Sequence, residues 1–360
     1  MKNLEFFAGV DTHRDTHSIV VINQVGELVE SFQISAESRG YAEAIELLAK
    51  YEGLVWGLEG TGSYGRPFAD ALVRAGHTVY EVPGMISKRH RQRLRHPGKS
   101  DVQDAHAIAE AILRERNTLP RHLEADAEEA TRLVYERRDR NVREQTVKVN
   151  RIRALALRLE LELPKDMTTG RALATVMARL SKHRSQGYAD LEVIDEIGDL
   201  VTDLRIVIKR IAELERRMRP FVKDLVPGLP RLRGCSVVTA AGLIGHAGLL
   251  LNYRSADAFA SHAGVAPVPC SSGKHVAVRL QTGGNRQLNR CLHNIANVQM
   301  RTEGHAGKIY YDRKRAEGKT HREAMRSLKR RLATVVFRTI QAAQISRNVL
   351  RQTPAALAAA

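Results

Sequence analysis

Several features that the sequence lacks narrow the classes of protein it can belong to. Its three cysteines, Cys235, Cys270 and Cys291, stand apart with no C-x-x-C pair, so neither a zinc ribbon nor a disulfide framework is indicated. No stretch reaches about 18 apolar residues, which argues against a membrane-spanning helix. The segment Met1–Phe7 carries Glu5 and lacks the apolar run of a signal peptide. We therefore expect a cytoplasmic protein with no membrane partner.

Negative charge is scarce in the last 140 of the 360 residues. Residues 221–360 hold 22 Lys/Arg against 6 Asp/Glu, whereas residues 1–115 hold 13 against 16 and residues 116–220 hold 22 against 18. Nearly all of the formal charge of +17 therefore lies at one end of the chain. A basic surface kept for solubility is one explanation. The other is a phosphate-binding face, because Lys and Arg that displace counterions give nucleic-acid affinity whatever the sequence.

The first 115 residues alternate between strand and helix patterns. We predict strands at Phe6–Val10, Ser18–Ile22, Glu27–Ile34, Leu54–Leu58 and His77–Val82, and helices at Tyr41–Tyr51, Arg66–Ala75 and Asp101–Glu115. Three hairpin-connected strands followed by alternating helices and strands is the order of an RNase H-like α/β fold. An actin-like ATPase begins in a similar way, but Asp11 is followed by Thr12-His13-Arg14-Asp15, without the glycines that wrap phosphates. This absence argues against nucleotide hydrolysis.

The middle of the chain has apolar residues at the spacing of a coiled coil. One series is Ile194, Ile197, Val201, Leu204, Ile208, Ile211 and Met218, and an earlier one is Val142, Val149, Ile152, Ala156, Leu159 and Leu163. Two such helices, joined by Lys165–Ala189, form either an antiparallel hairpin or a dimer seam. After Pro220 the composition turns basic, and we predict a long terminal helix at Thr320–Asn348.

Four acidic residues stand out by position. Asp11 follows the first strand, Glu59 ends the fourth, and Asp101 and Asp104 share one face at the start of a helix. In an RNase H-like sheet the first and fourth strands are neighbours, which brings Asp11 next to Glu59. Carboxylates this close repel unless cations hold them, and oxygen ligands suit Mg²⁺ or Mn²⁺. Two such ions about 4 Å apart stabilise both oxygens of a phosphoryl transfer. The alternative is that the aspartates at the helix start are only caps.

Basic residues precede the second half of this quartet. They are Lys88, Arg89, Arg91, Arg93, Arg95 and Lys99. Such a run is expected where a phosphate backbone passes beside carboxylates, although a solvated basic loop has the same composition. In the basic part, Ser271 and Ser272 precede Gly273-Lys274, and Gly284-Asn285-Arg286 follows. Lys274 and Arg286 are candidate nucleic-acid contacts, while the serine pair alone indicates only an exposed turn.

Together these motifs resemble the DEDD-type insertion-sequence transposases, a family described as bridge-RNA-guided serine recombinases. The matching elements are Gly9-Val10-Asp11 with His13, Glu59-Gly60-Thr61-Gly62, Lys99-Ser100-Asp101 through Asp104-Ala105, the central coiled coil, and the Pro-x-x-x-Ser-Ser-Gly-Lys stretch ending in Gly284-Asn285 and Leu288. Two positions depart from the family pattern. The arginine expected after leucine stands one place late as Arg290, and the expected Ser-Lys before Gly-Asn is Gln281-Thr282-Gly283.

The resemblance implies a RuvC-like domain whose acidic residues are Asp11, Glu59, Asp101 and Asp104, and a basic domain that supplies a nucleophilic serine. It also implies a composite site across subunits of a tetramer. A noncoding guide RNA would pair with target and donor DNA, in the cytoplasm of a bacterium at its nucleoid. Of the serine pair we choose Ser272, because Gly273 beside it allows close approach of a phosphate.

We therefore predict a RuvC-like domain at residues 1–118, a coiled-coil oligomerisation region at 119–220, a mostly helical basic transposase domain at 221–350 and a tail at 351–360. The expected activity is metal-dependent cleavage and rejoining of double-stranded DNA by a dimer or tetramer. Two alternatives remain, a RuvC-like junction-resolving nuclease and a non-catalytic nucleic-acid-binding protein whose acidic quartet only caps and packs.

Overall fold

The computed structural model describes residues 5–93, 100–123, 126–185, 187–269, 278–280 and 283–357. The chain divides into two compact units, Met1–Ala125 and Asp126–Ala360. This division follows residue 125, a little beyond the end of the RuvC-like domain predicted at residue 118. Within the described ranges, no helix combines the length and the hydropathy needed to cross a bilayer.

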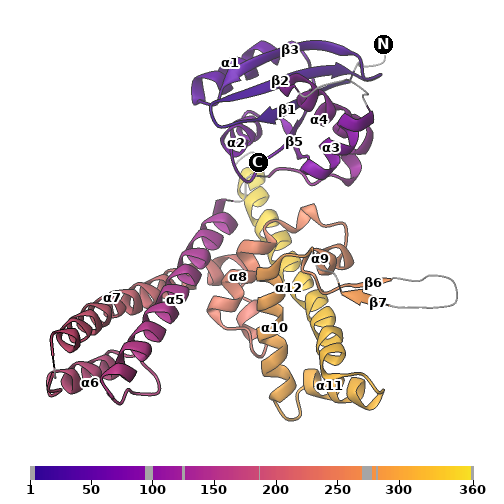
Figure 1. Cartoon of the computed structure of the whole chain (residues 1–360). Helices are drawn as coiled ribbons and strands as arrows, with labels where there is room; N and C mark the ends of the chain where they lie inside the picture. The colour runs from indigo at the N-terminus through magenta and orange to yellow at the C-terminus, as the bar shows by residue number, and fades with distance from the viewer. Residues whose placement is uncertain are drawn as a thin grey trace. The chain divides into compact units, whose positions relative to one another are not determined.

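The first unit contains a five-stranded sheet. Its strands are β1 (Phe6–Thr12), β2 (Thr16–Asn23), β3 (Leu28–Ser35), β4 (Val55–Leu58) and β5 (Thr78–Glu81). They lie in the order β3-β2-β1-β4-β5, with β1 antiparallel to β2 and parallel to β4 (Figure 1). The predicted neighbours, the first and fourth strands, are therefore adjacent, and the mixed sheet has the RNase H-like order that the sequence pattern indicates.

Helices cover both faces of this sheet, because successive residues of the central strands point to opposite sides. One face, which includes Ala8 and Val10 of β1, packs on α1 (Ser38–Leu48) and α2 (Arg66–Arg74). The other, which includes Phe7, packs on α4 (Asp101–Glu115). A further helix, α3 (Gly84–Arg93), was not predicted: only Ser87 and His90 along it are buried, so it has no apolar periodicity.

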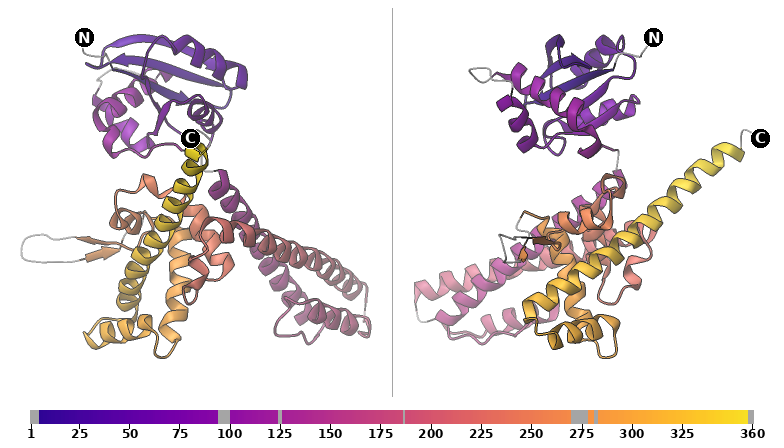
Figure 2. Two further views of the ribbon diagram at one scale, coloured as in Figure 1. Left: turned by 180° about the vertical axis from the view of Figure 1, so that it is seen from behind. Right: turned by 90° about the vertical axis from the view of Figure 1, so that its right-hand side faces the viewer.

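The second unit begins with a pair of long helices, α5 (Asp126–Arg158) and α7 (Tyr188–Leu225), with α6 (Gly170–Leu180) between them in the chain. Lys148 pairs with Asp203 and Arg151 with Glu196. Residue numbers therefore increase along α5 in the direction in which they decrease along α7. The pair is therefore antiparallel and formed within one chain. Figure 2 shows it as an arm that extends from the helices around α8 and α10.

The basic part of the chain shares a core with the base of this arm. It contains α8 (Val237–Ala247), α9 (Ala256–His262), α10 (Arg286–Arg301), α11 (Ala306–Ala316), α12 (His321–Leu357) and the short strands β6 (Pro267–Pro269) and β7 (Val278–Leu280). Val134 and Tyr135 of α5 and Leu214 and Met218 of α7 are buried in the same cluster as α8, α10 and α12. The arm and the basic part thus form one unit.

Two features of the second unit differ from the sequence pattern. Helix α7 continues through Pro220 to Leu225, because Val222 and Leu225 are buried in the shared core. Helix α12 runs beyond the predicted end at Asn348 to Leu357. The described cysteines, Cys235 and Cys291, are free and buried.

Candidate active site

The pairing of β1 with β4 places the first two acidic residues side by side. Val10 is in register with Leu58, and the Glu59 N–H donates a hydrogen bond of 3.3 Å to the Val10 carbonyl oxygen. The Thr12 hydroxyl in turn donates to the Glu59 carbonyl oxygen at 2.8 Å. Asp11 and Glu59 therefore leave the sheet at the same edge, as parallel neighbours must.

Glycine and alanine bring the other two carboxylates to this edge. A Cβ added to Gly9 would lie 2.1 Å from the Ala105 carbonyl oxygen and 2.4 Å from the Ala109 nitrogen. Helix α4 thus crosses β1 in backbone contact, which larger residues would prevent. Asp101 and Asp104 occupy the first turn of α4, which Ser100 caps by accepting a hydrogen bond from the Gln103 N–H.

His13 completes a compact group of possible ligands. Its Nε2 lies 3.2 Å from an Asp11 carboxylate oxygen and 3.4 Å from an Asp101 oxygen. Donor atoms of Asp11, His13 and Asp101 all lie within 4.8 Å of one another. His13 follows Asp11 by two residues, the spacing that returns to the same side of an extended chain. That spacing was the signal that could have identified His13 as a candidate ligand.

The electrostatics of Asp11 reflect this crowding. Partial burial raises the pKa of Asp11 above its ordinary value, His13 opposes that change, and Asp104, Asp101 and Glu59 raise the pKa further. The other three acidic residues predicted from the sequence therefore all act on Asp11. A divalent cation relieves such repulsion, and the carboxylate oxygens of this group suit Mg²⁺ or Mn²⁺. The residues present fit a metal.

The two remaining carboxylates are held by α3. The Ser87 hydroxyl donates to Glu59 at 2.7 Å, and Gly84 lies so close that an added Cβ would come within 2.6 Å of Glu59 Oε1. Arg91 donates to an Asp104 carboxylate oxygen at 2.5 Å. Helix α3, absent from the predicted elements, thus orients half of the quartet.

The predicted nucleic-acid contacts have different environments. Arg89 pairs with Glu115 and Arg91 with Asp104, so two of these charges are neutralised within the unit. Lys88, Arg93 and Arg286 are exposed. The other predicted contacts, Arg95, Lys99 and Lys274, lie outside the described residues, as do Ser271 and Ser272.

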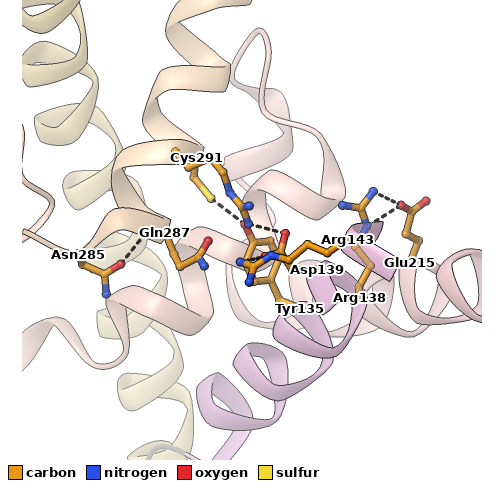
Figure 3. A network of polar contacts seen from close by, with 9 residues as sticks. Tyr135, Arg138, Asp139, Arg143, Glu215, Asn285, Gln287 and Cys291 are labelled. Carbon is orange, nitrogen blue, oxygen red and sulfur yellow. Dashed lines mark hydrogen bonds and ion pairs between the residues drawn. The ribbon is translucent and has the colours of Figure 1, made fainter. Parts of the chain in front are cut away.

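A polar network in the second unit contains Arg290, the arginine that departs from the family pattern. Arg290 of α10 donates to the Tyr135 hydroxyl at 2.8 Å and to Asp139 of α5 at 2.7 Å. Asp139 also accepts from Arg143, and Tyr135 contacts Cys291 (Figure 3). Burial is the main cause that raises the pKa of the Cys291 thiol to about 11. The network joins the arm to the basic helices.

Comparison with protein families gives two matches along the chain. Residues 8–159 match a family described as transposase, of the DEDD type and the IS110 group. Residues 228–312 match the transposase family of IS116, IS110 and IS902. The first match contains Asp11, Glu59, Asp101 and Asp104, and the second contains the segment with Ser271 and Ser272.

Similar proteins belong to bacterial insertion elements. The chain is 25% identical to a 44.8 kDa protein of insertion element IS116 from Streptomyces clavuligerus, over 92% of this chain and 93% of that protein. It is 27% identical to a 43.6 kDa protein of IS110 from Streptomyces coelicolor, over 92% and 93%. It is 24% identical to a 42 kDa protein of IS900 from Mycobacterium paratuberculosis, over 92% and 94%.

Among solved structures, two of RuvC from Thermus thermophilus are similar to part of the chain. One, in complex with a Holliday junction substrate, covers 33% of this chain and 99% of the RuvC chain, with 17% identity and a TM-score of 0.27. The other covers 32% and 99%, with the same identity and TM-score.

Proposed function

Because the chain belongs to the DEDD-type insertion-sequence transposases, we propose that it moves an insertion element by cleaving donor and target DNA and rejoining the strands. The observation that carries this proposal is the convergence of Asp11, Glu59, Asp101 and Asp104 at one sheet edge. Bound there, Mg²⁺ or Mn²⁺ would supply positive charge to the attacking and leaving oxygens. Asp11 and Asp101, with His13 between them, would hold the cation.

Ser272 is the nucleophile in this proposal. Its hydroxyl oxygen attacks the scissile phosphorus and the hydroxyl proton passes to a base, while the bond to one DNA end breaks and the leaving oxygen takes up a proton to become a hydroxyl. A hydroxyl of the second DNA strand then displaces the serine and rejoins the backbone. Serine is a weak nucleophile at neutral pH and needs activation. Acidic groups are few in its own segment, with 6 among residues 221–360, so the reaction would depend on the carboxylates of the quartet.

Assembly and guidance belong to the same proposal. Leu133, Val147 and Leu157 of α5 are 54%, 67% and 81% exposed, and Ile206 of α7 is 45% exposed. The proposed homo-oligomer, a dimer or tetramer, would form through the arm and would cover these apolar side chains. The family resemblance supports a noncoding guide RNA, and sequencing the RNA that copurifies with the protein tests it.

Substitution of single carboxylates tests the activity. With DNA that carries the ends of the element, Asp11→Asn and Asp104→Asn should each lose about a thousandfold in strand cleavage, because several kcal/mol of transition-state stabilisation are removed. Asp15→Asn, at a fully solvated neighbour that is 89% exposed, is the control and should cleave normally. Normal cleavage by either quartet variant would refute the role of the quartet.

A second set of variants identifies the nucleophile. Ser272→Ala should lose the covalent protein–DNA adduct and strand exchange while keeping DNA binding, and Asp104→Asn should lose the adduct too. An adduct in Ser272→Ala but not in Ser271→Ala would move the role to Ser271. If neither serine matters, water is the nucleophile and the enzyme is a junction-resolving nuclease of the RuvC kind.

A further inference from the structure

A cationic pocket lies within the second unit. A surface pocket of about 440 Å³ is formed by the start of α10, by α12 and by the backbone before β6. Its lining residues are Gly264, Gly284, Arg286, Asn289, Arg290, His293 and Lys329. More than half of these residues can carry a positive charge, and none of them is acidic.

Lys329 is the central group of this pocket. It is partly buried, and its ammonium donates a hydrogen bond of 2.8 Å to the Asn289 side-chain oxygen. Among the described residues, no carboxylate forms an ion pair with it. Burial, and then the charge of Arg326, lower the pKa of Lys329. A partly desolvated cation without a counter-charge is costly, and a bound anion would offset that cost.

Hydrogen bonds and a backbone contact fix the groups that line the pocket. The Asn289 side-chain nitrogen donates to the carbonyl oxygens of Ala263 and Gly264, at 3.0 Å each, which turns the amide oxygen toward Lys329. A Cβ on Gly284 would lie 2.3 Å from the Gly264 Cα, so the two backbones touch and no side chain fills that side.

The positive groups of the pocket differ in availability. Arg290 is engaged by Asp139 and Tyr135. Arg286 is exposed and has no ion pair among the described residues. Of the lysine and arginine side chains that line the pocket, Lys329 and Arg286 are therefore the two that no described carboxylate engages, and both can donate to an anion. Lysine and arginine together are typical donors to phosphate oxygens.

We propose that this pocket binds a backbone phosphodiester of the DNA, with Lys329 and Arg286 as its donors. The assignment rests on the proposed transposase function, which supplies DNA as the anion. The unit around the pocket has 42 Lys/Arg against 23 Asp/Glu, so its field also favours a polyanion. The pocket is a binding site that positions the strand, and the cleavage chemistry remains with the quartet.

The salt dependence of DNA binding by the full-length protein measures this contact. For a short DNA duplex, the slope of log affinity against log salt is negative, and its magnitude should fall by about 0.9 in Lys329→Met, which keeps the aliphatic stem and removes one phosphate contact. Arg286→Gln should do the same, and Lys329→Arg should keep the slope. Lys308→Met is the matched control: Lys308 already pairs with Glu303 and Asp312, so the slope should not change.

Chemical labelling of lysines gives an independent readout. The duplex should protect Lys329 from acylation, as read by mass spectrometry, and should leave Lys308 unprotected. An unchanged slope in Lys329→Met, or no protection of Lys329, would overturn the proposal. Protection by an RNA hairpin but not by DNA would overturn it in favour of RNA. If the slope is unchanged while Asp104→Asn still abolishes cleavage, the pocket assignment alone fails. If the slope falls but the wild type cleaves no DNA, the proposed function fails.

Discussion

Gly9 and Ala105 are in contact through their backbones, and this contact sets the position of two carboxylates. A Cβ on Gly9 would lie 2.1 Å from the Ala105 carbonyl oxygen, far inside normal contact. Gly9→Ala should therefore push α4 from the sheet, at a cost of about 3 kcal/mol in the free energy of unfolding. Chemical denaturation measures that cost.

The same substitution should also weaken Mn²⁺ binding, although it removes no ligand, because Asp101 and Asp104 move with α4. Gly62→Ala is the matched control, since an added Cβ there meets nothing within 4 Å and Gly62 is not at positive φ. It should keep both stability and Mn²⁺ affinity. Unchanged Mn²⁺ affinity in a folded Gly9→Ala protein would show that the position of α4 does not control the site.

Much of the first unit could be predicted because its patterns are local. The continuous buried runs of β1 and β2 and the apolar face of α4 appear directly in the sequence, and the helix Asp101–Glu115 has the predicted bounds. The adjacency of Asp11 and Glu59 then follows from strand order. Helix α3 was missed because its contacts are polar, namely Ser87 with Glu59 and Arg91 with Asp104. No period in hydrophobicity signals such contacts.

For the second unit, the sequence pattern predicts the long helices but not which helices pack together. Heptad spacing indicates two long helices but does not choose between a hairpin and a dimer seam. The choice depends on pairs distant in sequence, such as Lys148 with Asp203. Likewise, composition suggested a boundary at Pro220, whereas burial of Val222 and Leu225 carries α7 past it. The role of Ser272 stays a prediction, since it lies outside the described residues.

Arg91 would compete with a bound cation for Asp104. Its guanidinium lies 2.5 Å from an Asp104 oxygen, so a metal that uses this carboxylate must displace or share it. Arg91→Met should raise Mn²⁺ affinity about fivefold in the absence of DNA, which corresponds to about 1 kcal/mol for a partly exposed pair. Isothermal titration of the full-length protein measures this.

Arg89→Met is the control for that effect. It removes the same charge from the same helix, but Arg89 pairs with Glu115 at the far end of α4. Its Mn²⁺ affinity should stay near that of the wild type. An equal rise in both variants would mean that general charge, rather than the Arg91–Asp104 contact, sets the affinity.

The two units should differ sharply in their affinity for nucleic acid. Residues 1–125 hold 15 Lys/Arg against 17 Asp/Glu, a net charge of −2, whereas residues 126–360 hold 42 against 23, a net charge of +19. The fragment to compare is 126–360, because residues 221–360 share their core with Val134 and Tyr135 of α5 and Leu214 of α7. This fragment should bind duplex DNA of any sequence. A plot of log affinity against log salt should have a slope of about −0.9 for each contacted phosphate.

A fragment that begins at residue 221 tests the effect of net charge separately from the effect of the folded core. Residues 221–360 carry a net charge of +16 but lack the α5 and α7 side chains of the shared core. This fragment should show little cooperative unfolding by circular dichroism, while fragment 126–360 unfolds cooperatively. Fragment 1–125 should bind DNA weakly at every salt concentration, since phosphates meet a negative net charge and two of its arginines are already paired with Glu115 and Asp104. Tighter DNA binding by 1–125 than by 126–360 would contradict this division of labour, because a negatively charged unit would then bind phosphates more strongly than a unit with a net charge of +19.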